Sequence, residues 1–497
     1  MKKIDGIDEM PIVKSVIAYK EKNTISLHVP GHKKGQSFAE TGMEFPWSEA
    51  LKYDTTEVDV IDNLHFPERA IMEAEEKAAK LFGADKTFFL VNGTTAGILA
   101  MIHSVAVPGD SIIIPRNCHK SVFNAIVLGR LNPIYLLPES DDLYRVGMGI
   151  NPEDVEAAFE KNPSAKAVLI TSPSYYGICC DIEKIAEIAH RRGKVLLVDE
   201  AHGAHFCFSE DCPKSALACG ADAVAQSTHK CLSSFTGTSM LHISGKKIDL
   251  EKIRFYLQAY QTTSPNHILL AGLDAARYQM EKKEGRDKLE EVICLGKWAK
   301  TEINRIPGLR AIDDSLIGSS SIYAVDPTRL SISVKMLGIT GVYAEKYLRD
   351  SFNIQIEMAD AHNIVAIFSI GNRKEDFVCF VDALKELSNL YFSRNDKIND
   401  QKEDSEWEFN RELPEIAMNP WDAIFGSKKR IPIEICEEEI AAEMLIPYPP
   451  GIPIIMPGER ISKNVVEYIN ICLKNGIKVN SSIGNKQGYI SVAWDSK

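Results

Sequence analysis

Short apolar runs that alternate with amphipathic segments constrain the fold of this chain more than any other feature. Between residues 87 and 243 these runs have the length and the β-branched composition of buried strands. Strands that alternate with helices form βαβ units, so we expect an α/β fold whose mostly parallel, doubly wound sheet is covered on both faces. The predicted strands are Thr87–Val91, Ser111–Pro115, Ile134–Leu137, Ala167–Thr171, Val195–Asp199, Ala223–Ser227 and Ser239–Ile243.

Several helices between these strands carry recognisable end signals. An apolar pattern at helical spacing begins at Ala70, and Gly83 stands where a helix commonly ends. Asn151, followed by Pro152, is a predicted N-cap, and Asp181 is predicted to cap the helix that runs to His190.

The rest of the chain divides by composition. A long helical stretch, Leu269–Thr301, leads out of the predicted sheet domain and is followed by a second, smaller α/β pattern. The predicted segments are an N-terminal arm (1–67), a large cofactor-binding domain (68–300), a small α/β domain (301–392), a polar linker (393–407) and a C-terminal domain (408–497).

Charge and cysteine content limit the possible partners. Acidic residues outnumber basic ones by 69 to 57, which argues against a nucleic-acid or anionic-membrane partner and mildly favours a cationic substrate. No apolar run approaches the roughly 20 residues of a membrane helix. The odd count of 11 cysteines, without a secretory signal, predicts reduced thiols and a cytoplasmic protein. No metal site is expected, because the cluster His202, His205, Cys207 and Cys212 lacks a CxxC pair.

Polar residues follow four of the predicted strands, at the edge where open parallel sheets bind ligands. Gly93, Thr94 and Thr95 lie between a strand and a helix start, which suits a phosphate cradle, although a plain capped turn explains them equally well. His119, past another strand, could lie flat on a ring, although a lone histidine is more often structural.

The other two clusters supply a carboxylate and an amine. Asp199 ends an apolar strand, where a carboxylate can keep a heterocyclic nitrogen protonated, and a turn-forming role is the alternative. Lys230 lies in a small, hydroxyl-rich loop, and a lysine of lowered pKa forms an imine with a carbonyl cofactor. Ser227 and His229 beside it can donate to a phosphate. Along one sheet, the four clusters together describe a pyridoxal 5'-phosphate site.

The chain resembles the bacterial Orn/Lys/Arg decarboxylases of fold type I, the aspartate-aminotransferase fold. The resemblance covers nearly the whole chain, and the Ser-x-His-Lys and Tyr-Pro-Pro-Gly-Ile-Pro motifs make it specific. The matching stretches are Pro30–Lys33, Leu64–Pro67, Asn92–Thr95, Thr171–Gly177, Asp199–His202, Ser227–Lys230, Thr262–Pro265, Tyr448–Pro453 and Pro457–Glu459.

The resemblance implies a role for each site residue. Lys230 would hold pyridoxal phosphate as a Schiff base, Asp199 would pair with the pyridine nitrogen, and His119 would stack on the ring opposite Ala201. His202 would lie near the phenolic oxygen or the substrate carboxylate. The phosphate ligands would be Gly93, Thr94, Thr95, Ser227 and His229, with Thr262 or Thr263 from the neighbouring subunit of a homodimer or larger even oligomer.

The resemblance also implies a reaction and leaves its substrate open. Because the arm motif already appears at Pro30, the chain is expected to lack the N-terminal wing of longer members and to resemble the biosynthetic branch, which makes agmatine from arginine for polyamine synthesis. Lysine or ornithine decarboxylation, an aminotransferase and a catalytically silent homologue are the alternatives. The candidate partners for the distal cation of the substrate are Glu357, Asp360, Glu443 and Glu459.

Two positions depart from the family pattern. Gly237 stands where the family usually has glutamine, and Asn266-His267 where it usually has Ser-Tyr. Both departures concern the phosphate site and the subunit interface rather than Lys230.

Overall fold

The fold is described from a computed structural model. It describes residues 5–22, 24–58, 60–319, 321–395, 413–448, 452–474, 477–484 and 488–494. Within these ranges the chain forms two compact units. Unit 1 comprises residues 1–104, 198–210 and 214–290, and unit 2 comprises residues 105–197, 211–213 and 291–497. The predicted domain boundaries differ from this division and stay a prediction. Residues 396–407 of the predicted linker and residues 449–451 of the Tyr448–Pro453 motif lie outside the described ranges.

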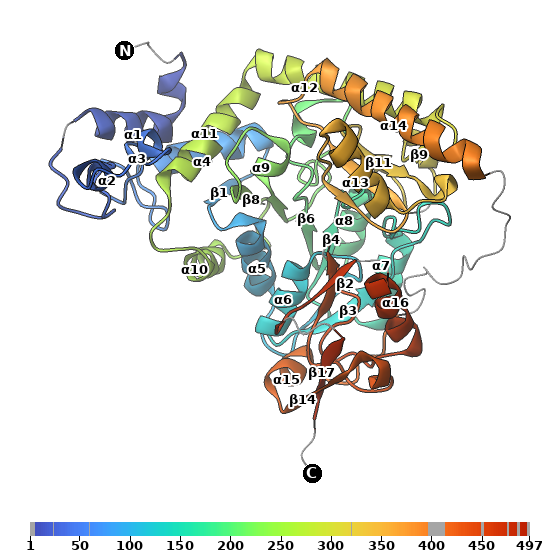
Figure 1. Cartoon of the computed structure of the whole chain (residues 1–497). Helices are drawn as coiled ribbons and strands as arrows, with labels where there is room; N and C mark the ends of the chain where they lie inside the picture. Colours follow the sequence, from blue (N-terminus) through green and yellow to red (C-terminus); the bar gives the residue numbers. More distant parts are fainter. Residues whose placement is uncertain are drawn as a thin grey trace. The chain divides into compact units, whose positions relative to one another are not determined.

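The predicted α/β sheet is present. Its hydrogen-bonded strand order is β1-β8-β7-β6-β4-β2-β3, and β6 begins in unit 2 and ends in unit 1. β2 runs parallel to β3 and β4, whereas β8 runs antiparallel to β1 and β7 (Figure 1). The strands are β1 (Lys86–Leu90), β2 (Ser111–Pro115), β3 (Asn132–Leu136), β4 (Ala167–Thr171), β6 (Val195–Asp199), β7 (Ala223–Gln226) and β8 (Ser239–Ile243).

These bounds confirm the seven predicted strands to within two residues at each end. The predicted caps are also confirmed, because the side chain of Asn151 accepts from Glu153 N and that of Asp181 accepts from Lys184 N. Gly83 ends its helix with a φ of 77°. The long helical stretch, in contrast, is two helices, since Lys282 takes an extended backbone conformation between α11 and α12.

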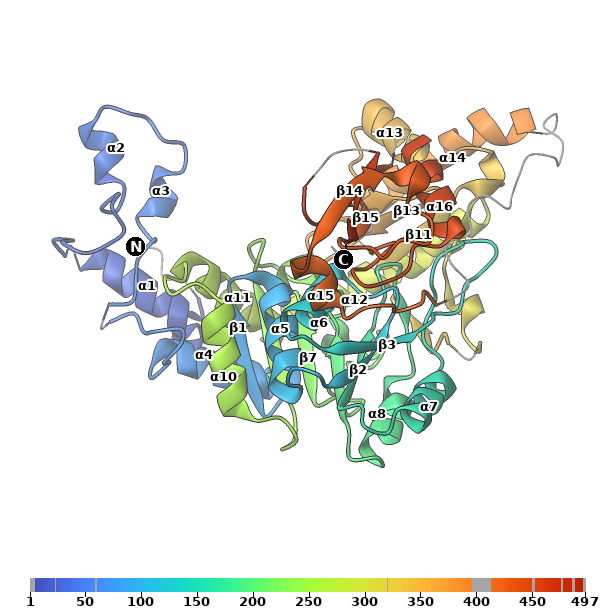
Figure 2. The same cartoon turned by 90° about the horizontal axis from the view of Figure 1, so that it is seen from below.

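Unit 1 packs helices around β1, β8 and β7. Figure 1 shows α1, α4 and α11 side by side, and Figure 2 shows the segment with α2 and α3 extending away from the strands of its unit. The helices are α1 (Pro11–Glu21), α2 (Gln36–Glu40), α3 (Ser48–Leu51), α4 (Ala70–Phe82), α5 (Gly93–Val105), α9 (Thr228–Cys231), α10 (Leu250–Tyr260), α11 (His267–Glu281) and α12 (Lys283–Asn304), of which α12 continues into unit 2.

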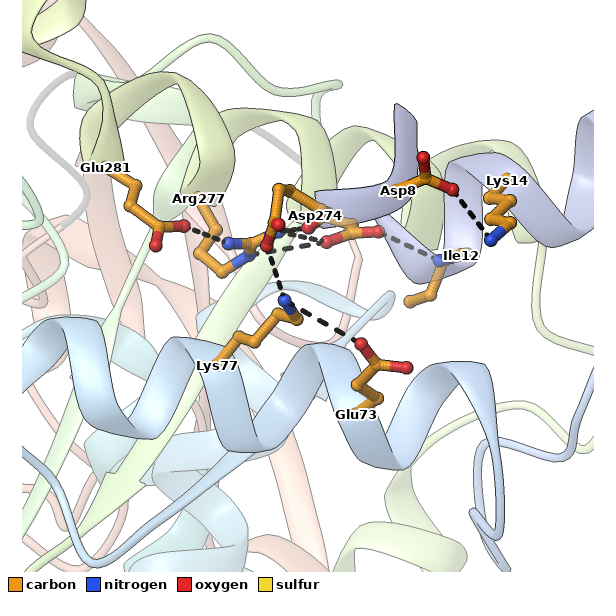
Figure 3. A network of polar contacts seen from close by, with 9 residues as sticks. Asp8, Ile12, Lys14, Glu73, Lys77, Asp274, Arg277 and Glu281 are labelled. Atoms are coloured by element: carbon orange, nitrogen blue, oxygen red, sulfur yellow. Dashed lines mark hydrogen bonds and ion pairs between the residues drawn. The ribbon is translucent and has the colours of Figure 1, made fainter. Parts of the chain in front are cut away.

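A polar network fastens α1 to α11 and α4 (Figure 3). The guanidinium of Arg277 is fully buried and is held by Asp274 at 2.9 Å and Glu281 at 2.6 Å. The second oxygen of Asp274 accepts from the backbone N–H of Ile12 at 2.9 Å. Because buried polar groups are costly unless paired, these contacts fix the start of the arm on α11, the helix that follows the Thr262–Pro265 segment.

Unit 2 contains the other strands of the large sheet with the helices between them, a four-stranded sheet and the C-terminal segment. The four-stranded sheet has the strand order β12-β13-β11-β9. Helices α12, α13 and α14 pack on it around a core that includes Leu330, Ile364 and Phe377. Its helices are α6 (Lys120–Leu128), α7 (Pro152–Lys161), α8 (Ile182–His190), α13 (Gly341–Phe352), α14 (Lys374–Asn395), α15 (Pro420–Phe425) and α16 (Lys463–Lys474). Its further strands are β5 (Ile178–Cys179), β9 (Arg310–Ala311), β10 (Ala324–Val325), β11 (Arg329–Ser333), β12 (Met358–Ala359), β13 (Asn363–Ile367), β14 (Lys428–Pro432), β15 (Leu445–Tyr448), β16 (Lys478–Ser481) and β17 (Tyr489–Ala493).

Among the described residues, no helix combines the length and the apolar character that spanning a membrane requires.

Candidate active site

Lys230 and His202 face each other at the ends of β7 and β6. Ser227 is the N-cap residue of the short helix α9, which places Lys230 one turn beyond the end of β7. Nζ of Lys230 lies 3.0 Å from Nε2 of His202, which follows β6 by three residues and is buried. An ammonium has only donors, so Nε2 of His202 is the acceptor when the amine of Lys230 is charged. The two side chains that the sequence placed near the reacting atoms are therefore in direct contact.

Asp199 is a buried carboxylate beside this pair. Its side chain is 3 % exposed and accepts from Ala201 N at 3.1 Å. Burial raises the pKa of the Asp199 carboxyl, while the nearby charge of Lys230 lowers it. A buried carboxylate is stabilised as an anion by a second cationic partner, which a protonated ring nitrogen would provide.

Three hydroxyl groups cluster on the same side of the sheet. The hydroxyl of Thr94, at the start of α5, contacts Ser227 and lies 2.8 Å from the hydroxyl of Ser239 on β8. Gly93 has a φ of 72°, and a Cβ built there would meet no atom within 4 Å. Its N–H donates to Gly237 O at 2.8 Å, so Gly237, one of the two departures from the family pattern, holds the cradle through its backbone.

This set of residues fits pyridoxal 5'-phosphate. Open space above Gly93 and hydroxyls at the N-terminus of a helix suit a phosphate group. The buried carboxylate of Asp199 suits a pyridinium nitrogen, and the amine of Lys230 suits an aldehyde. The remaining predicted phosphate ligands lie nearby in the sequence: Thr95 is exposed, and Nδ1 of His229 donates to Thr238 O at 2.8 Å.

The Thr262-Thr263 segment is fixed to the edge of the sheet by its neighbour Gln261. Oε1 of Gln261 accepts from Val91 N at 2.8 Å, at the end of the edge strand β1. His65, from the Leu64–Pro67 motif, contacts Thr262 O through Nε2 at 2.9 Å. Thr262 and Thr263 themselves are exposed. The other departure from the family pattern is structural, because Asn266 caps α11 by accepting from Ile268 N.

His119 lies in unit 2, as the N-cap of α6. Its Nδ1 accepts from Ser121 N at 3.2 Å, so the ring is held by its own helix. Three residues earlier, the buried guanidinium of Arg116 donates to Pro453 O at 2.8 Å, Ile454 O at 3.0 Å and Glu459 at 2.9 Å. The C-terminal Pro457–Glu459 motif therefore holds the loop that precedes His119, through the contact between Glu459 and Arg116.

The four candidate partners of the substrate cation also lie in unit 2. Glu357 is exposed and accepts from the Tyr175 hydroxyl, and Glu443 is buried and accepts from Ser481 and from Ser491 N. Glu459 is paired with Arg116. Asp360 accepts from the Tyr176 hydroxyl at 2.8 Å and borders a cavity of about 500 Å³, whose lining includes Arg116 and His362. The role of these four carboxylates in binding the distal cation of the substrate stays a prediction.

Several residues of the site were missed by sequence reasoning. Ser239 completes the hydroxyl cluster, and Gln261 fixes the Thr262 segment. Ser239 had a usable signal, since it begins a strand at the edge where ligands bind. Gln261 had none, because its partner on β1 lies 170 residues away in the sequence.

Comparisons with known proteins identify the family of this chain. A family model described as "Orn/Lys/Arg decarboxylase, major domain" matches residues 10–376, and one described as its C-terminal domain matches residues 403–478. The chain therefore belongs to the Orn/Lys/Arg decarboxylase family. It is a decarboxylase of fold type I that depends on pyridoxal phosphate.

Individual relatives span nearly the whole chain. An arginine decarboxylase of Bacillus subtilis is 38 % identical over 489 residues, covering 98 % of this chain and 99 % of the relative. One of Halalkalibacterium halodurans is 39 % identical over 472 residues, covering 95 % of each chain. Among solved structures, the lysine decarboxylase LdcF of Francisella novicida superposes with a TM-score of 0.81 at 23 % identity, covering 97 % of this chain and 81 % of that one. This last likeness supports the fold alone.

Proposed function

We propose that this decarboxylase acts on arginine and releases agmatine and carbon dioxide. The assignment of arginine as the substrate rests on similarity over almost the full chain to proteins named arginine decarboxylase, at 37–39 % identity. The lysine decarboxylases among the relatives are 24–25 % identical. The chain's net charge of −12 also suits a cationic substrate.

The residues of unit 1 would hold the cofactor and direct the reaction. Bound pyridoxal phosphate supplies an electron sink for the electrons that remain when carbon dioxide leaves. Asp199 would hold a proton on the ring nitrogen, which its burial favours because no water competes for the carboxylate. Lys230 would attach the cofactor, and its amine or His202 would deliver the proton to Cα of the substrate.

The hydroxyl cluster would bind the phosphate group. The hydroxyl of Thr94 contacts those of both Ser227 and Ser239, and hydroxyls can turn to donate to phosphate oxygens without moving the backbone. Gly93, Thr95 and His229 would complete this part of the site. His119 would cover one face of the ring and Ala201 the other, while His202 remains in contact with Lys230.

A homodimer, or a larger even oligomer, would complete the site. The exposed hydroxyls of Thr262 and Thr263 would reach the phosphate of the neighbouring subunit. Unit 1 also exposes large apolar side chains, which a subunit interface would bury. These side chains are Ile25, Leu27, Val29, Trp47, Phe66 and Phe255. A fully active monomer in sedimentation would contradict this part of the proposal.

The substrate is tested by measuring carbon dioxide release from arginine, lysine and ornithine in parallel. We expect the highest kcat/KM for arginine, with agmatine as the amine product. A higher kcat/KM for lysine or ornithine would contradict the assignment of arginine and leave the decarboxylase class unchanged.

A further inference from the structure

Four polar side chains form a buried row across unit 1 that the reaction does not use. Each comes from one of the neighbouring strands β1, β8 and β7 or from the residue after β6. They are Thr87, His242, Gln226 and Glu200. All are 2 % exposed or less. Burying four polar groups costs free energy unless each is hydrogen-bonded, so we expect these side chains to have a structural or functional role.

The row is a continuous chain of hydrogen bonds. The Thr87 hydroxyl lies 2.8 Å from Nδ1 of His242, and Nε2 of His242 lies 3.1 Å from Oε1 of Gln226. Nε2 of Gln226 donates to Glu200 at 2.6 Å, and the other oxygen of Glu200 accepts from Ala216 N at 2.7 Å. The ring of Phe82, from α4, stacks on His242 at 4.8 Å and covers the row.

The end of the row formed by Gln226 and Glu200 lies on the face of the sheet opposite to the residues proposed to bind the cofactor, whereas Thr87 and His242 pair in register with each other farther from that edge. Successive residues of a strand point to opposite faces of a sheet. Gln226 precedes Ser227, and Glu200 follows Asp199, so each pair has one member on either face. On β8, Ser239 and His242 are three positions apart and are also opposed. Accordingly Ser227 and Ser239 contact Thr94, whereas Gln226 and His242 contact each other.

The chain of hydrogen bonds is satisfied in either direction. With Glu200 ionised, every donor points toward its carboxylate, from the Thr87 hydroxyl through Nε2–H of His242 and the Gln226 amide. Burial raises the pKa of Glu200 to about 8 and lowers the pKa of His242 to about 3. When Glu200 holds a proton, its hydroxyl donates, the amide of Gln226 turns over and the histidine changes tautomer. The contacts between the strand ends persist in both states.

We propose that Thr87, His242, Gln226 and Glu200 form a positioning relay, which holds from behind the two strand ends that carry Asp199 and Ser227. Directional bonds between neighbouring strands fix the relative positions of their ends, whereas an apolar row would bury area without fixing them. The inference rests on the cofactor roles proposed for Asp199 and Ser227.

The test is the affinity of the cofactor-free full-length protein for pyridoxal 5'-phosphate, titrated by absorbance. Gln226→Leu interrupts the relay at its centre and should weaken binding about tenfold. The conservative variant Glu200→Gln, which can keep every bond in the reversed direction, should stay within about twofold of wild type. Amide hydrogen exchange over residues 225–230 should accelerate in Gln226→Leu and not in Glu200→Gln.

A merely structural role would give a different result. If Gln226→Leu lowers the melting temperature but binds the cofactor like wild type, the relay positions nothing and the inference fails. Equal weakening by Glu200→Gln would also overturn it. Should Gln226→Leu not fold, Thr87→Val removes only the terminal bond. An affinity lowered about fourfold then supports the relay, and an unchanged affinity overturns it. Failure of the cofactor role proposed for Lys230 is seen separately, as covalent attachment that persists at another residue in Lys230→Ala.

Discussion

Two buried polar networks stand next to the proposed cofactor residues and are built on different principles. The relay in unit 1 joins an amide, an imidazole, a hydroxyl and one carboxyl group, with no cation among its members. The network in unit 2 joins the guanidinium of Arg116 to the carboxylate of Glu459, both 4 % exposed or less. Neutral groups can exchange donor and acceptor roles, whereas a buried ion pair has one arrangement. The first network therefore tolerates a change of protonation that the second does not.

Removing the carboxylate proposed to face the cofactor is expected to have the largest effect on turnover. Asp199→Ala should keep the cofactor, which is held through its phosphate, yet lose about two to four decades of kcat, because a buried charge partner is worth about 3–5 kcal/mol. The measurement is steady-state turnover beside an absorbance assay of bound cofactor. Turnover within tenfold of wild type would mean that another residue protonates the ring.

Breaking the ion pair should affect stability more than chemistry. Glu459→Gln leaves the guanidinium of Arg116 buried without a counter-charge, so we expect a loss of about 3–5 kcal/mol in the free energy of unfolding by urea. The matched control is Glu439→Gln, which breaks the half-exposed pair with Lys429 and should cost about 0–1 kcal/mol. Equal losses in the two variants would contradict the difference drawn between buried and exposed pairs.

The pH dependence of stability reports the protonation of Glu200 in the relay. Burial raises the pKa of Glu200 to about 8 from an ordinary value of 4.5. The folded state keeps this proton longer than the unfolded state, so the contribution of Glu200 is present below pH 4.5 and is lost as the pH rises toward 8. Glu200→Gln does not titrate there. Its stability relative to wild type should rise by about 1 kcal/mol per pH unit across this window.

Glu75 provides the matched case for this measurement. Burial raises the pKa of its carboxyl to about 7, so the advantage of Glu75→Gln over wild type should level off near pH 7 and that of Glu200→Gln near pH 8. The measurement is urea unfolding of the three proteins from pH 5 to pH 9. A stability difference between wild type and Glu200→Gln that does not change from pH 5 to pH 9 would show that Glu200 is ionised throughout.

The fold could be predicted from the sequence wherever the signal was local. The strands of the large sheet are apolar runs with turn residues beside them, and the caps Asn151 and Asp181 act on N–H groups two or three residues away. The division at Lys282 was missed because the segments on both sides of it favour helix.

Within the site, the residues that carry chemistry were more predictable than those that hold them. Asp199 ends β6, and Lys230 follows the end of β7 by four residues, so their chemical type at these positions is informative. Thr87 and His242 are 155 residues apart, and Arg116 and Glu459 are 343 apart. Partners at such separations are brought together only by the folded sheet, and no local pattern indicates which buried polar residues will pair.

Chemical trapping tests whether Lys230 holds the cofactor. The protein should be reduced with borohydride, digested, and its peptides weighed by mass spectrometry. We predict that the mass of the reduced cofactor appears on the peptide containing Lys230, and that Lys230→Ala binds the cofactor reversibly but carries no label. A label on a different lysine of the wild-type protein, or a labelled Lys230→Ala variant, would contradict the account.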